Sequence, residues 1–159
     1  MIKLIIKILA IFLAVILQVT LMPIFSIKGN FPNLILLAAL ILVLADFKTD
    51  AIIVAAIGGL LFDFFSPLRF GLNTIIFISF VLLLGVVSKR YFPAINLFII
   101  ALVVFLSTII YGLLMSLFLQ RWLSWEILIE SLYACILGLI FFFVLDHFQK
   151  SSRLLKVES

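Results

Sequence analysis

Five polar residues interrupt the apolar runs of this sequence in a way that could support chemistry. They stand at the start of one apolar run and around the connection between two others: Asn33, Asp63, Ser66, Arg69 and Asn73. The carboxylate of Asp63 is costly to place beside hydrocarbon unless it is paired or hydrated. Arg69 follows in the same connection and is its expected partner. The group could therefore form a ligand pocket or an ion pair that closes a turn, and we favour the turn.

The residues after Asp63 predict how the chain reverses. Ser66 and Pro67 are expected to end one helix, because proline lacks a backbone donor and clashes with the preceding turn. Gly71 permits a tight re-entry, and Asn73 is expected to cap the next helix.

A second acidic pair, Glu126 and Glu130, lies one helical turn apart at the start of the last apolar run. The positive end of a helix dipole explains Glu126 without any function. Glu130 is expected to lie deeper and to need a partner, and Arg121 is the nearest basic residue in sequence. We favour a structural ion pair here over a site lined by Glu130.

Patterns typical of enzymes and metal sites are missing from the sequence. It contains no Ser-centred Gly motif, no Glu-x-x-His and no paired histidines, since His147 is the single histidine. Cys135 is the single cysteine, which excludes a thiol cluster for a metal. We expect a protein that is not an enzyme and needs no cofactor.

The composition indicates that the bilayer is the solvent of this chain. Of the 159 residues 67% are hydrophobic and 11% are charged, whereas a soluble domain is roughly half apolar and a quarter charged. The net charge of +4 comes from basic residues at the ends of apolar runs, so they read as topology signals and not as a nucleic-acid surface. A single transmembrane domain over residues 1–159 is expected.

The apolar runs predict an all-α bundle of six transmembrane helices. A spanning helix needs roughly 20 residues, so the second and third runs are short for full spans. The expected helices cover residues 4–21, 33–45, 51–65, 72–88, 94–119 and 126–145, with a charged hairpin at 46–50 and a short basic tail. Placing both termini in the cytoplasm puts eight of the 11 Lys and Arg residues inside. A five-helix alternative buries the charges of the hairpin, so we reject it.

Small residues recur at helical spacing, which lets helix backbones approach closely in a membrane. One such face contains Ala51, Ala55 and Gly59, and another contains Ala10 and Ala14. We expect contacts within the bundle at these faces more than contacts with partners.

The run from Gly58 to Asn73, preceded by Phe31-Pro32-Asn33-Leu34, resembles the MreD family of rod shape-determining proteins. Its sharpest part is a Gly-Leu-x-x-Asp-x-x-Ser-Pro pattern, and the matching residues are Gly59, Leu60, Asp63, Ser66 and Pro67. The resemblance covers most of the chain in length, helix number and basic tail. Residues 45–48 depart from it, because a Gly-rich connection would be expected there.

The resemblance implies a multi-pass protein of the bacterial inner membrane, a non-enzymatic scaffold of the elongation complex that acts in cell shape and lateral peptidoglycan synthesis. The implied partner is an MreC-like periplasmic scaffold, with the MreB cytoskeleton and the peptidoglycan synthases reached through it, besides membrane lipid. The family is similar in fold to substrate-binding subunits of energy-coupling-factor transporters, which implies an outer pocket near Asp63 and Asn73.

The alternative function is such a vitamin-binding subunit itself. It would use the outer polar cluster as its ligand site and the Ala10 and Ala14 face to dock on a coupling subunit. A small membrane enzyme is a third reading, with only isolated carboxylates in its favour.

Overall fold

The computed structural model describes residues 2–21, 23–24, 26, 31–66, 70–91, 96–119 and 125–157. These residues form helices and contain no β-strand, which confirms the all-α class. The elements are α1 (Ile2–Thr20), α2 (Leu34–Leu44), α3 (Lys48–Ile53), the π-helical turn η1 (Val54–Gly58), α4 (Gly59–Asp63), α5 (Leu72–Tyr91), α6 (Leu97–Phe118) and α7 (Glu126–Val157).

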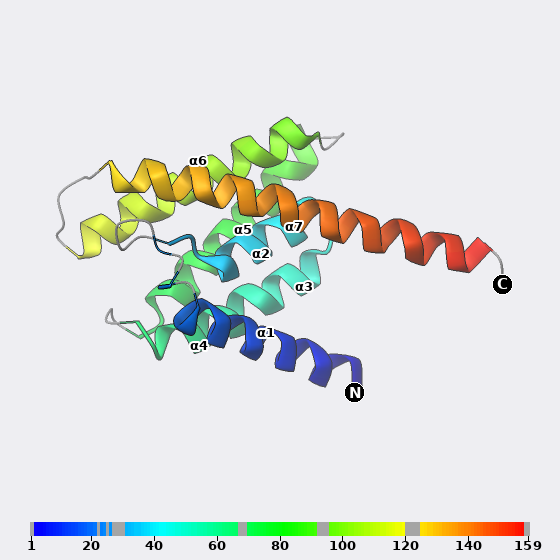
Figure 1. Cartoon of the computed structure of the whole chain (residues 1–159), viewed down its shortest axis with the longest axis horizontal. Helices are drawn as coiled ribbons and strands as arrows, with labels where there is room; N and C mark the ends of the chain where they lie inside the picture. Colours follow the sequence, from blue (N-terminus) through cyan, green and yellow to red (C-terminus); the bar gives the residue numbers. More distant parts are fainter. Residues whose placement is uncertain are drawn as a thin grey trace.

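The helices lie side by side along the long axis of the molecule and reverse direction from one run to the next (Figure 1). The start of α1 and the end of α7 lie at the same end of the bundle. We call this the terminal end, and the end that carries the start of α2, the start of α5 and the start of α7 the opposite end.

Helix α2 lies at the centre of the bundle. It contacts α1, α3, η1, α5, α6 and α7. Of its 11 residues, eight are buried, and they fall on every side of the helix. A helix that is apolar all round needs this kind of enclosure. The core continues from α2 into α5 and α6, where Phe77, Ile100 and Val104 are fully buried.

The hairpin at the terminal end is tighter than the sequence predicted. We expected the third helix to begin at residue 51, but α3 begins at Lys48, so the turn consists of Ala45, Asp46 and Phe47. Asp46 adopts a left-handed backbone with φ 65, which aspartate tolerates better than most residues. The hairpin charges do not require a longer loop, because Lys48 and Asp50 lie at the end of the bundle, where Asp50 pairs with Lys7 of α1.

Helix α7 also differs from its expected length. The expected end was residue 145, whereas the helix continues to Val157 through the basic tail. This last part extends beyond the other helices (Figure 1).

The π-helical turn keeps one face of the helical run from α3 to α4 in the core. Ala51, Ala55, Gly59 and Asp63 are all buried although they are spaced four residues apart. In a plain α-helix such a series drifts around the axis, since a turn takes 3.6 residues. The wider turn of η1 absorbs one residue. About eleven of the residue steps from Ala51 to Asp63 then remain, and they make about three α-helical turns. Asp63 therefore lies on the same face as Ala51.

Close packing at small residues is found along the face of Ala51, Ala55 and Gly59. A Cβ added at Gly59 would lie 2.8 Å from the Cα of Thr74, so α4 and α5 touch backbone to backbone. Ala51 and Ala55 are fully buried. On the other face Ala10 is exposed and Ala14 is half-buried, so α1 is packed on one side only.

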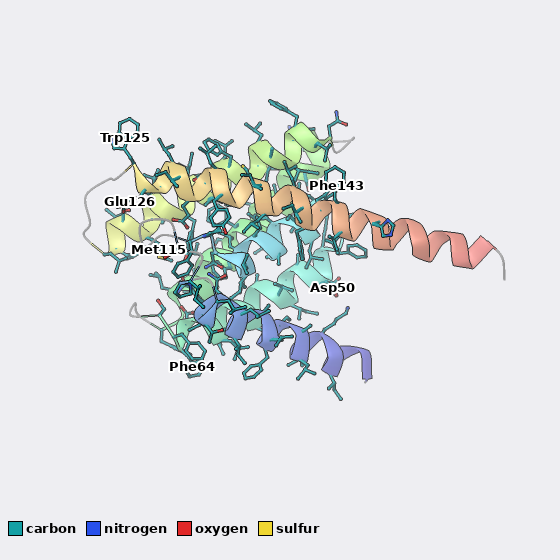
Figure 2. All side chains as sticks on the ribbon, viewed as in Figure 1. Asp50, Phe64, Met115, Trp125, Glu126 and Phe143 are labelled. Carbon is teal, nitrogen blue, oxygen red and sulfur yellow. The ribbon has the colours of Figure 1, made fainter. Side chains whose placement is uncertain are left out.

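Large apolar side chains remain exposed around the whole bundle (Figure 2). They include Leu9 on α1, Val86 on α5, Phe98 on α6 and Ile136 on α7. Two helical segments, Leu97–Phe118 and Glu126–Leu145, are long and apolar enough to cross a membrane, and the shorter segments Lys7–Thr20, Leu34–Leu44 and Leu72–Ser88 are apolar as well.

A buried polar network as candidate functional site

Asp63 at the end of α4 is the centre of a buried polar network. Its side chain is only 3% exposed. One carboxylate oxygen, Oδ1, accepts hydrogen bonds from the backbone N–H of Asn73 at 3.0 Å and from its Nδ2 at 2.8 Å. The other oxygen, Oδ2, accepts from the backbone N–H of Thr74 at 3.1 Å and from its hydroxyl at 2.7 Å. Asp63 therefore caps α5 from a different helix.

Electrostatics and hydrogen bonding act together at this cap. The first N–H groups of a helix have no partner within the helix and carry a partial positive charge. A carboxylate that receives two of them satisfies the donors and also neutralises part of that charge. Gly71, whose φ is 90, turns the chain directly before α5, as the sequence predicted.

The network continues from α5 to α6 and α2. The hydroxyl of Tyr111 donates to Oδ1 of Asn73 at 3.1 Å and accepts from Nδ2 of Asn33 at 3.3 Å. Asn33 uses its own Oδ1 to accept the backbone N–H groups of Ile35 and Leu36, each at 3.1 Å. Asn33 is thus the N-cap of α2, and Tyr111 joins that cap to the cap of α5.

Gln18 of α1 completes the start of α2. It is 1% exposed. Its Oε1 accepts the backbone N–H of Leu34 at 2.8 Å, and its Nε2 donates to the carbonyl of Pro32 at 3.2 Å. The amide side chain of Gln18 therefore binds both the first N–H group of α2 and a carbonyl of the segment before it.

The network satisfies its own hydrogen-bonding groups. Among the described residues, every buried side-chain nitrogen and oxygen has a hydrogen-bond partner. Unpaired buried polar groups are costly, so a closed network of this kind is stabilising as a unit. It joins α1, α2, α4, α5 and α6 at the opposite end of the bundle.

The structure brings three of the predicted residues together and corrects the role of one. Asn73 donates to Asp63, and Tyr111 links Asn73 to Asn33. Asn73 was predicted to cap α5, and this is wrong: Asn73 lies in the first turn of that helix, and Asp63 provides the cap. Arg69 lies outside the described residues, so its pairing with Asp63 stays a prediction. Ser66 is half-buried and donates its backbone N–H to the carbonyl of Asp63 at 3.3 Å.

Glu130 lies beside the network without joining it. It is half-buried in the first part of α7, and its charge interacts with the phenol of Tyr111. Within the described part of the chain its carboxylate makes no hydrogen bond or ion pair, and Arg121, its expected partner, lies outside that part. Figure 2 shows Glu126 and Trp125 at the same end of the molecule as Met115, and Trp125 is 83% exposed.

Sequence reasoning missed Gln18, Thr74 and Tyr111. Each is a polar residue within or next to an apolar run, and such a residue is usually hydrogen-bonded when it is buried. That signal marks the residue but not its partner. Only Thr74 lies close in sequence to a predicted site residue.

Comparison of the chain with protein-family models, with curated proteins and with solved structures yields no match.

Proposed function

We propose that this chain is a six-span membrane protein with both termini on the cytoplasmic side. Exposed apolar side chains surround α1, α5, α6 and α7, which suits lipid and not water. The helical runs alternate in direction, and both the start of α1 and the end of α7 lie at the terminal end (Figure 1). Lys7, Lys48 and Arg90 lie at that end, in agreement with the excess of basic residues expected on the cytoplasmic side.

The buried network supports this proposal because it satisfies helix N–H groups that water could not reach inside a membrane. Helix α2 has 11 residues, or about 16 Å of length, while the hydrocarbon core is about 30 Å thick. A helix that begins below the membrane surface cannot use water to satisfy its first N–H groups. Asn33 and Gln18 receive those of α2, and Asp63 receives two of those of α5.

Within this membrane protein, we propose a scaffold role in the bacterial elongation complex, as the likeness to the MreD family suggests. The supporting observation is that Gly59 and Asp63, two residues of the family-like pattern, form a closed structural corner with Asn73 and Thr74. A scaffold requires a rigid surface and no reacting groups. The proposed partner is an MreC-like periplasmic protein, through which MreB and the peptidoglycan synthases are reached.

Capture of partners in the native membrane tests the scaffold role. Tagged protein is crosslinked in cells, purified in mild detergent, and its partners are identified by mass spectrometry. We expect a periplasmic coiled-coil scaffold and cell-wall synthases, and we expect depletion of the protein to turn rod-shaped cells round. Normal rods after complete depletion, together with the absence of those partners, would contradict the scaffold role.

A second candidate function rests on α1. Its Ala10 is exposed and its Ala14 is half-buried, so this face is available for another helix. A substrate-binding subunit of an energy-coupling-factor transporter would use it to dock on a coupling subunit. Recovery of paired ATPases and a coupling subunit in the same experiment would favour this function, and Ala10→Phe would then abolish the association. The closed network disfavours it, because a ligand needs polar groups that are still free to bind.

A further inference from the structure

A groove at the terminal end of the bundle lies apart from the polar network. It is open on one side, has a volume of about 360 Å³, and runs between α2, α3 and α5. Its apolar walls include Val43, Ile52, Val81 and Val86. Lys48 also lines the groove, and with Asp46 beside it forms what we call the rim. In the proposed topology the groove opens to the hydrocarbon of the inner leaflet, and Lys48 lies near the headgroups.

The floor of the groove is open because of Gly85. A Cβ added at Gly85 would meet no atom within 4 Å. The glycine is therefore not required for contact between helices, in contrast to Gly59, which touches Thr74. The missing side chain leaves room for a foreign apolar group, and the flanking walls can contact it along its length.

The rim carries two opposite charges. The ammonium of Lys48 lies 3.5 Å from Oδ1 of Asp46, and the side chain of Lys48 is 28% exposed while that of Asp46 is 85% exposed. Such an exposed pair is weak by itself. A headgroup with its own anion and cation can bind both residues, its phosphate at Lys48 and its ammonium at Asp46.

We propose that this groove binds a phospholipid whose headgroup carries a primary ammonium, as phosphatidylethanolamine does, with one acyl chain over Gly85. The proposal rests on the membrane topology proposed above. Charge complementarity selects the lipid: an anionic headgroup satisfies Lys48 but is repelled by Asp46, and a quaternary ammonium has no N–H to donate to the Asp46 carboxylate. Basic pockets between transmembrane helices bind anionic lipid headgroups; here the carboxylate of Asp46 beside Lys48 disfavours a headgroup of net negative charge.

Native mass spectrometry of the full chain in mild detergent tests the proposal. The protein is titrated with phosphatidylethanolamine, phosphatidylcholine and phosphatidylglycerol that carry identical acyl chains. We expect phosphatidylethanolamine to bind about tenfold more tightly than either of the others, the effect of one good charge-assisted hydrogen bond. Equal binding of the three lipids, or a preference for phosphatidylglycerol, would overturn the proposal.

Substitutions at the rim and floor separate the two parts of the site. Asp46→Asn is expected to shift the preference from phosphatidylethanolamine to phosphatidylglycerol, and Lys48→Gln to weaken both about tenfold. Gly85→Leu fills the groove and is expected to remove all three lipids. Leu83→Phe is the matched control, because Leu83 is 67% exposed on the same helix and does not line the groove.

The outcomes also separate this proposal from the topology on which it rests. A Cβ at position 85 meets no atom within 4 Å, so Gly85→Leu is expected to fold and to unfold at a temperature no lower than that of the wild type. Retained lipid binding by this folded variant would contradict the groove. A protein that is extracted from membranes only by detergent but shows no headgroup preference rejects the lipid site alone. Recovery of the chain from the cytosol without detergent rejects the topology.

Discussion

Replacing Asp63 by alanine is expected to lower the free energy of unfolding by about 3–4 kcal/mol. The carboxylate accepts four hydrogen bonds, two of them from the backbone of α5. In the membrane proposed above, hydrogen bonds between helices contribute about 0.6 kcal/mol each on average, which gives about 2.4 kcal/mol for four. Loss of a charged group at a helix N-terminus adds about 1 kcal/mol. Buried donors left without an acceptor raise the cost further.

The measurement is reversible unfolding of the purified protein in mixed micelles by titration with sodium dodecyl sulfate, followed by circular dichroism. Asp63→Asn divides the effect. The asparagine side chain keeps one oxygen, which can still accept from Asn73. Its amide nitrogen faces the backbone N–H of Thr74, and no hydrogen bond forms there because both groups are donors. We expect about half the loss seen for alanine. Asp46→Asn is the control, because Asp46 is exposed, and we expect a change within about 0.5 kcal/mol.

A free energy of unfolding for Asp63→Ala within about 1 kcal/mol of that for Asp46→Asn would contradict the structural cap, since such a loss is no larger than a cap alone contributes. Loss of rod shape in cells that carry Asp63→Ala, with unchanged stability of the purified protein, would point instead to a ligand-binding role of Asp63. The two readouts therefore distinguish a structural corner from a binding site.

Two further predictions concern the contacts around this corner. Gly59→Ala places a methyl group 2.8 Å from the Cα of Thr74 and is expected to lower the free energy of unfolding by about 1–3 kcal/mol. Its control is Gly85→Ala, which has open space around it and is expected to stabilise by up to about 1 kcal/mol. The same unfolding titration compares the two variants. Tyr111→Phe removes the hydroxyl that joins the caps of α2 and α5 and is expected to lower the free energy of unfolding by about 1–3 kcal/mol. Tyr133→Phe is its control and is expected to change stability by less than about 0.5 kcal/mol. Similar losses for the two tyrosines would contradict a special role of Tyr111.

The sequence predicted the helices well because the signal was local. Apolar runs separated by charges, Pro and Asn place the helices to within a few residues of their observed bounds, apart from the early start of α3 at Lys48 and the extension of α7 to Val157. Both errors have the same cause. Charges were read as ends of helices, but a helix can carry charges wherever it leaves the packed bundle. The π-helical turn left no such local signal.

The site was predicted only in part because most of its partners are distant in sequence. Asp63 and Asn73 are joined by a short connection, so their convergence followed from the turn. Tyr111 bonds to residues 38 and 78 positions away, and Gln18 bonds to the start of α2 from another helix. Such pairs depend on how the helices pack side by side. The local capping rule assigned the cap of α5 to Asn73, the nearest suitable residue. In the structure the packing of α4 against α5 places Asp63 there as the cap.

The spacing of Gly59 and Asp63 has a physical explanation in their shared contact with Thr74. Gly59 allows α4 to approach the Cα of Thr74, and Asp63, one turn later on the same face, accepts both the N–H and the hydroxyl of that residue. A side chain at position 59 would push the start of α5 away from the carboxylate. The close approach therefore sets the hydrogen-bond distances, and the hydrogen bonds hold the close approach. We infer that the two residues act as one unit, so the losses caused by Gly59→Ala and Asp63→Ala combined should be smaller than the sum of the separate losses.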